Sequence, residues 1–188
     1  NYDSDISKGN QYRLIYEKLN LPQLCPTNDM CAENFLANLL RRRGYVFERK
    51  SALDSKHKRA IQPFELQGYS VDLISAVGNN DMACLSELCN SQQHILACNR
   101  FGESTLHMAA RKSHYQVVQL ILRSEASPLM IDDYGRSPLS DAMWAVSPSF
   151  NIINLLMVTS LDLLFLADVR GFTPLNYVRR EHVFKICL

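Results

Sequence analysis

The stretch Ser104–Leu122, STLHMAARKSHYQVVQLIL, decides the fold of this chain. Its apolar residues fall into two groups with helical spacing, and Ser113 and His114 lie between the groups. Two short amphipathic helices cannot bury their apolar faces alone, so the pattern predicts packing against further units of the same kind. The apolar positions are Leu106, Ala109 and Ala110 in the first group, then Val117, Val118, Leu120, Ile121 and Leu122 in the second.

The segment that leads into this stretch recurs along the chain. The pattern (Asp/Asn)-x-x-Gly-x-(Ser/Thr)-x-Leu is present at residues 99–106, 132–139 and 168–175, with spacings of 33 and 36 residues. Regular spacing of this size is typical of stacked helical repeats. A weaker copy lies upstream, where Leu73, Ala76, Leu85 and Cys89 precede Leu106, Ala109, Val118 and Leu122 by 33 residues.

Each position of the pattern has a physical role. Asp or Asn bonds the amides of a tight turn, and Gly adopts a positive φ without steric cost. The Ser or Thr accepts a hydrogen bond from the unpaired amides at a helix start, and Pro is well tolerated at the first helical position. The sequence therefore predicts turns at Gly102, Gly135 and Gly171, and each turn is followed by a helix. The capping residues are Ser104, Ser137 and Thr173, and the prolines are Pro138 and Pro174.

The same residues resemble the ankyrin repeat family, whose pattern TPLHxAAxxGHxxVVxLLL is similar to Ser104–Leu122. The resemblance covers residues 66–188 and implies an all-α, ankyrin-type solenoid of stacked helix-turn-helix repeats. The units are 67–99, which is degenerate, 100–132, 133–168, and a partial cap at 169–188. Glu125 and Ser160 replace the family's Gly between units, and its histidine is kept only as His107. We expect this array to be less regular and less stable than a consensus array.

Residues 1–65 do not join the repeat pattern. Two groups of apolar residues at helical spacing lie on either side of the breaker stretch 21–28. We expect a helical extension that covers the exposed side of the first repeat as an N-terminal cap. The groups are Leu14, Ile15 and Leu19, then Phe35, Leu36, Leu39 and Leu40.

The family resemblance implies a non-enzymatic scaffold or adaptor that binds another protein through its turn tips and first helices. Phe101 and Tyr134 hold equivalent positions, so stacking should place two exposed aromatic rings in a row beside Arg side chains. Aromatic residues and Arg are enriched at interface hot spots. The alternative is that the rings pack on neighbouring turns and only stiffen the array. The predicted partner-binding residues are Arg100, Phe101, Glu103, Asp133, Tyr134, Arg136, Arg170 and Phe172.

The stretch from residue 41 to residue 59, here called the basic segment, has eight Lys or Arg against two acidic residues in a chain that is nearly neutral overall. Such a run is a solvated linker, a nuclear-import or acidic-protein contact, or a nucleic-acid anchor. The last use gives the alternative function, a structural subunit or nucleic-acid-associated adaptor. The basic residues are Arg41, Arg42, Arg43, Arg49, Lys50, Lys56, Lys58 and Arg59.

Other classes of protein lack support in the sequence. The chain contains none of the common hydrolase, nucleotide-binding or metalloprotease motifs, and its scattered Cys and His residues suggest neither a metal site nor a cofactor. The longest apolar stretch, 152–169, is interrupted by polar residues, so we expect no membrane span. Because the catalytic motifs are missing, we also expect no small-molecule substrate. Trp144 should lie in the core, and the cysteines should be reduced. We expect an intracellular protein, cytoplasmic or nuclear; organelle targeting stays open because the chain starts without Met.

Overall fold

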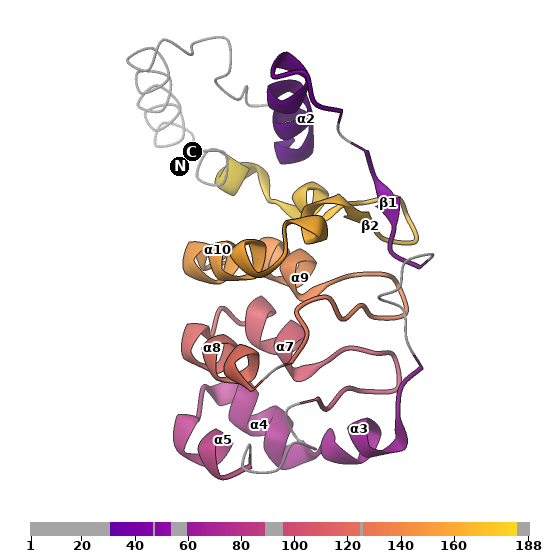
Figure 1. Ribbon diagram of the computed structural model, residues 1–188. Helices are drawn as coiled ribbons and strands as arrows, with labels where there is room; N and C mark the ends of the chain where they lie inside the picture. The colour runs from indigo at the N-terminus through magenta and orange to yellow at the C-terminus, as the bar shows by residue number, and fades with distance from the viewer. Residues whose placement is uncertain (1–30, 47, 54–59, 89–95, 125, 184–188) are drawn as a thin grey trace. The chain divides into compact units, whose positions relative to one another are not determined.

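A computed structural model describes residues 31–46, 48–53, 60–88, 96–124 and 126–183. The chain divides into two compact units, which are considered separately. The larger unit, Arg49–Tyr177, contains the repeats, and the smaller contains Asn1–Glu48 with Val178–Leu188. Figure 1 shows the repeats as successive layers of the larger unit.

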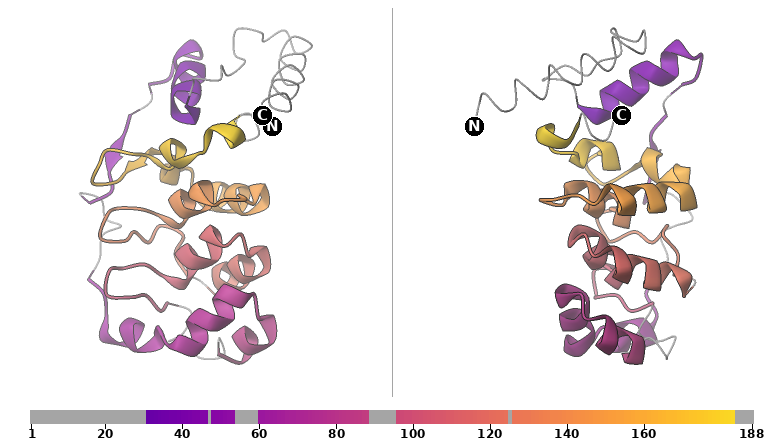
Figure 2. Two further views of the ribbon diagram at one scale, coloured as in Figure 1. Left: turned by 180° about the vertical axis from the view of Figure 1, so that it is seen from behind. Right: turned by 90° about the vertical axis from the view of Figure 1, so that its left-hand side faces the viewer.

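The repeat unit contains stacked helix pairs, as the sequence predicts for an all-α ankyrin-type solenoid. The first helices α4, α7 and α9 pack in order, and so do their partners α5, α8 and α10 (Figures 1 and 2). The pairs are α4 (Val71–Asn79) with α5 (Met82–Leu88), α7 (Thr105–Arg111) with α8 (Tyr115–Arg123), and α9 (Pro138–Trp144) with α10 (Phe150–Thr159). A short helix, α3 (Pro63–Gly68), precedes them, and η2 (Leu161–Phe165), β2 (Leu166–Ala167) and η3 (Pro174–Tyr177) follow.

The predicted helix starts are confirmed at the two central repeats. Ser104 and Ser137 are the N-caps of α7 and α9, and Pro138 is the first residue of α9. Each serine hydroxyl accepts a hydrogen bond from the backbone amide three residues later, at 3.4 Å in both helices. In the last repeat Thr173 leads into a 3₁₀ helix of four residues, as suits a partial closing unit.

The core follows the repeat register. Leu106 and Leu139 occupy equivalent positions at the starts of α7 and α9, and both are fully buried. Leu73 of α4 and Leu175 of η3 are buried at the matching places of the outer repeats. One column of leucines therefore crosses the whole array, and it confirms the predicted register, including the degenerate first unit.

The prediction that Trp144 lies in the core is wrong, because 45% of its surface is exposed. Leu139, Ala142 and Met143 provide the inward side of α9 and are fully buried. Trp144 follows one residue later, about 100° further around the helix, so its ring leaves the core side. It lies 6.2 Å from the ring of Tyr177, centroid to centroid.

Part of the N-terminal third packs against the last repeat. Strand β1 (Lys50–Ser51) pairs in parallel with β2, and the Ala52 amide donates to the Ala167 carbonyl at 2.9 Å. Further along, the Cys98 amide donates to the Glu65 carbonyl of α3 at 3.2 Å, so α3 contacts the first hairpin. The boundary at residues 65 and 66 and the N-terminal cap stay predictions. Residues 50–52, however, contact the last repeat, whereas the extension was expected to cover the first repeat.

The smaller unit contains helix α2 (Ala32–Arg42), which confirms the helix predicted around Phe35–Leu40. The Cys31 sulfur caps it by accepting a hydrogen bond from the Asn34 amide at 3.4 Å. A short 3₁₀ turn, η4 (Arg180–His182), also lies in this unit. The helix predicted around Leu14 lies outside the described residues.

Truncation of the core leucines tests the register. Leu106→Ala and Leu139→Ala should each lower the free energy of unfolding by about 2–5 kcal/mol, because each leaves a cavity in the leucine column. Denaturant titration followed by circular dichroism at 222 nm measures the loss. Val158→Ala on α10 is the matched control, since Val158 is exposed and should cost close to nothing. Equal losses at Val158 and the two leucines would contradict the register.

Candidate protein-binding face

The three turns have the same hydrogen-bonded geometry. In each, the side-chain oxygen of the first residue accepts from two backbone amides, two and four residues later. This double acceptor closes the turn without any tertiary partner. The oxygen is Oδ1 of Asn99 (2.9 and 3.1 Å), of Asp132 (3.0 and 2.8 Å) and of Asp168 (2.8 and 2.9 Å).

The turn glycines are required by conformation and, in two turns, also by space. Gly102 and Gly135 both have φ +79°. A Cβ on Gly102 would lie 3.2 Å from the Ile131 carbonyl oxygen, and one on Gly135 would lie 3.2 Å from Asp168 Cα. Neighbouring hairpins therefore approach through backbone contact that any side chain would push apart.

Backbone hydrogen bonds join one tip to the next. The Asp133 amide donates to the Phe101 carbonyl at 2.8 Å, and the Val169 amide donates to the Tyr134 carbonyl at 2.9 Å. The tips of three successive hairpins are thus fixed side by side. These backbone hydrogen bonds set the spacing of the side chains at the tips, including the predicted row of aromatic residues Phe101 and Tyr134.

Each tip presents an aromatic ring under an Arg guanidinium. The residues Phe101, Tyr134 and Phe172 are exposed by 49%, 57% and 44%. Guanidinium groups at such distances from a ring face are attracted by its quadrupole. The pairs are Arg100 with Phe101 (4.6 Å from guanidinium carbon to ring centroid), Arg136 with Tyr134 (5.2 Å) and Arg170 with Phe172 (4.9 Å); we call these six residues the tip row.

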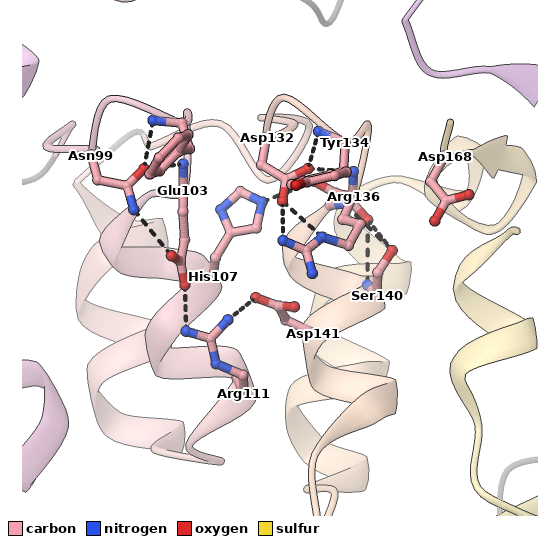
Figure 3. Close-up of polar contacts among 12 residues, drawn as sticks. Asn99, Glu103, His107, Arg111, Asp132, Tyr134, Arg136, Ser140, Asp141 and Asp168 are labelled. Atoms are coloured by element: carbon pink, nitrogen blue, oxygen red, sulfur yellow. Dashed lines mark hydrogen bonds and ion pairs between the residues drawn. The ribbon is translucent and has the colours of Figure 1, made fainter. Parts of the chain in front are cut away.

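Two predicted binding residues, Glu103 and Arg136, lie in ion pairs below the tips (Figure 3). Arg111 bridges Glu103 of its own repeat and Asp141 of the next, with the second contact at 2.9 Å. Arg136 pairs with Asp132 at 2.6 Å. These partly buried pairs hold the tips in place. Asp133, by contrast, lies exposed at its tip.

Burial has an electrostatic consequence for Asp141. Burial raises the pKa of this carboxyl above its usual range, and the nearby His107, Arg111 and Arg136 oppose the rise only in part. The Asp141 carboxylate thus lies near two arginines of adjoining repeats, and its desolvation there is unfavourable.

His107 connects one repeat to the next hairpin. Its Nδ1 lies 2.8 Å from the Ser104 hydroxyl, and its Nε2 lies 3.1 Å from the Arg136 carbonyl oxygen. Ser140 takes the equivalent place in the next repeat, where its hydroxyl meets the Ser137 amide at 3.4 Å. The shorter side chain bonds only within its own unit there, which agrees with the expectation of a less regular array.

An aromatic cluster at the last repeat was missed by the sequence analysis. The Tyr177 ring lies between Trp144 at 6.2 Å and Phe172 at 6.3 Å, and the Arg170 guanidinium is 5.5 Å from it. The spacing of Trp144 from the inward residues of α9 was the available signal. The cluster extends the tip row toward the helices.

Asp168 anchors this cluster. Tyr177 donates its hydroxyl to Asp168 Oδ2, and the Arg170 guanidinium lies 3.4 Å from the same oxygen. Desolvation alone would raise the pKa of Asp168, but the bonds from Tyr177 and the turn amides outweigh it and hold the pKa below its usual value. Burial and the adjoining Asp168 raise the pKa of Tyr177 to about 12.

The basic segment is divided between the two units. Arg41, Arg42 and Arg43 are exposed at the end of α2, whereas Arg49 and Lys50 are exposed in the repeat unit. The remaining basic residues, Lys56, Lys58 and Arg59, lie outside the described residues.

Two kinds of site are not found within the described ranges. No group of His, Cys, Asp and Glu side chains there could hold a metal ion. Nor is any described helix long and apolar enough to cross a bilayer.

The lowered pKa of Asp168 predicts acid sensitivity. A carboxyl with a folded-state pKa below its unfolded value of about 3.9 stabilises the fold above that pH, and the contribution is lost as pH falls through the folded value. Asp168→Asn keeps the turn acceptor, as Asn99 does, but should cost about 1 kcal/mol or more at neutral pH and reduce the loss of stability below about pH 4.

Thermal melts between about pH 2 and pH 7 measure this effect. Asp133→Asn in the adjoining tip is the control and should follow the wild-type curve, because Asp133 is exposed. If the Asp168→Asn and wild-type curves differ by a constant amount at every pH, the charge of Asp168 has no part in stability.

Comparison with known proteins agrees with this geometry. No curated protein matches the chain, but residues 73–164 match the family model of ankyrin repeats in three copies. The matched range begins in α4 and ends in η2, so it spans all three helix pairs and two of the three tips. With their capped helix pairs, glycine turns and stacked hairpins, residues 73–164 are therefore ankyrin repeats.

Proposed function

We propose that this chain is a non-enzymatic scaffold or adaptor that binds another protein through the tip row and the adjoining first helices. Ankyrin repeats are generally non-catalytic modules for protein–protein interaction. The observation that carries the proposal is an exposed ring beside a guanidinium at three successive hairpin tips. Phe101 and Tyr134 precede the turn glycine at equivalent positions, and Phe172 follows it.

The tip row has the physical properties of a binding hot spot. Aromatic and Arg side chains provide the largest contact energies at interfaces, and a preorganised surface loses less entropy on binding. Backbone bonds between tips and the ion pairs of Glu103 and Arg136 supply that preorganisation. In this proposal Glu103 and Arg136 position the row, while Phe101, Tyr134 and Phe172 make the main contacts.

The charges of the face favour a partner held by stacking and apolar contact. Arg136 and Arg170 already lie beside Asp132 and Asp168, so their charges are largely balanced within the chain. The turn acids are occupied in the same way, because their oxygens accept turn amides. These hydrogen bonds support a structural role for Asp132 and Asp168, and not a catalytic one.

Removal of two tip rings tests the proposal. Phe101→Ala with Tyr134→Ala should weaken partner binding by about 2 kcal/mol or more, roughly thirtyfold, with little change in melting temperature. Affinity purification with the whole chain and quantitative mass spectrometry identifies proteins retained by the wild type, and calorimetry with the purified partner then gives the affinity.

The control is Val158→Ala, an exposed valine on α10, which is a second helix of its pair and lies outside the proposed binding face. This control should keep wild-type affinity. If the ring variant also keeps wild-type affinity while its melting temperature falls, the rings only stiffen the array and the proposal is wrong.

Salt dependence separates this function from the alternative of a nucleic-acid anchor. Binding through the tip row should change less than about threefold between 50 and 300 mM salt, because few free charges take part. Anchoring of generic RNA or DNA through about six phosphates in the basic segment would lose several orders of magnitude over the same range. Fluorescence anisotropy with labelled RNA and with the labelled partner makes the comparison on one preparation.

A further inference from the structure

The edge of the last hairpin is occupied by an extended segment from the N-terminal third of the same chain. We call this segment, Lys50–Ala52, the strap. Lys50 is paired with Leu166 and Ser51 with Ala167 in a parallel register, and the Ala52 amide donates to the Ala167 carbonyl at 2.9 Å. Figure 1 shows β1 beside β2, although the two strands are far apart in the sequence. The hairpin edge therefore already accepts a peptide backbone.

The space around Ala52 sets a size requirement. Ala52 has no exposed surface, and a Cβ on Gly135 would lie only 3.1 Å from the Ala52 Cβ. Gly135 thus leaves room for one methyl group at this position, and a longer side chain would meet the turn. An occupant of this edge needs a small residue such as Ala, Gly or Ser here.

The position two residues earlier has an electrostatic preference. The Lys50 ammonium lies 3.7 Å from the Asp162 carboxylate, and both side chains are largely exposed. An exposed pair of this kind adds little affinity, but it disfavours an acidic residue at the same place. Together the two positions define a short pattern, a cation followed two residues later by a small side chain, in extended backbone.

The strap is a small contact for an intramolecular strand. Only two residues are paired in the sheet, and a two-stranded contact of this length has little stability of its own. Covalent connection keeps the strap at high effective concentration near its edge, which compensates for weak contacts. Addition of an extended peptide to an exposed sheet edge is a common way to bind partners, with affinity from the backbone and specificity from alternate side chains.

We propose that the β2 edge and the Gly135 turn form a second binding site, which takes an extended peptide with a cation two residues before a small residue. The strap fills this site as an internal ligand, and a partner peptide of the same chemistry replaces it. The site differs from the tip row, because it is formed by hairpin backbone and recognises a strand.

The test uses the whole chain and a fluorescent peptide, ERKSALD, which has the sequence of residues 48–54. Ala52→Glu should displace the strap, because the buried site has no room for a carboxylate. This variant should bind the peptide at least about tenfold more tightly than the wild type does, since the wild-type site is filled in cis.

Matched peptides check the two positions. A peptide with Glu in place of the Ala should not bind the Ala52→Glu chain measurably, and one with Glu in place of the Lys should bind a few-fold more weakly. The proposal is overturned if the Ala52→Glu chain, with its helical circular dichroism intact, binds ERKSALD no better than the peptide with Glu in place of the Ala.

Hydrogen exchange on the wild type decides the matter if the Ala52→Glu chain does not fold. The buried Ala52 amide should exchange slowly in the free chain and lose protection in excess ERKSALD, while the turn amides of Tyr134 and Arg136 stay protected. Unchanged protection of Ala52 at millimolar peptide would show a permanent strand and overturn the proposal. Neither experiment involves the tip-row partner, so failure here leaves the proposed scaffold function untouched.

Discussion

The three hairpins of the repeat unit depend on one local interaction, a side-chain oxygen that accepts two backbone amides across a turn with a positive-φ glycine. Asn99, Asp132 and Asp168 make this interaction in successive hairpins. It reverses the chain and delivers Ser104 and Ser137 to the starts of their helices. Because the turn closes within a few residues, its geometry is the same in all three hairpins, and hairpins of the same geometry can stack.

Stacking then converts local turns into a surface. The carbonyls of Phe101 and Tyr134 accept amides from the next hairpin, so neighbouring rings are held at a fixed separation. Arginines have two uses in this arrangement, since Arg136 pairs with Asp132 and also covers the Tyr134 ring. The ion pairs that neutralise the face also order it, which favours recognition through rings and guanidinium planes over long-range attraction.

The strap changes the mechanics of the array. A simple repeat protein has contacts only between neighbouring units, so its ends can unfold independently. Here Ala52 contacts the last two hairpins, and Glu65, a short distance along the chain, contacts the first. Two segments that are close in sequence therefore contact the first and the last hairpins. Such non-local contacts should raise the cooperativity of unfolding in repeats that depart from the family pattern at Glu125 and Ser160.

The sequence by itself determined the glycine turns, the serine caps and the leucine column, because turn chemistry and helical periodicity act over a few residues. It also located Phe101 and Tyr134 at equivalent tips. Only the tertiary structure decided which side chains meet across repeats: Arg111 with Asp141, Trp144 with Tyr177, and the strap with β2. These contacts join residues distant in sequence, and their geometry depends on how whole hairpins stack, which no local pattern encodes.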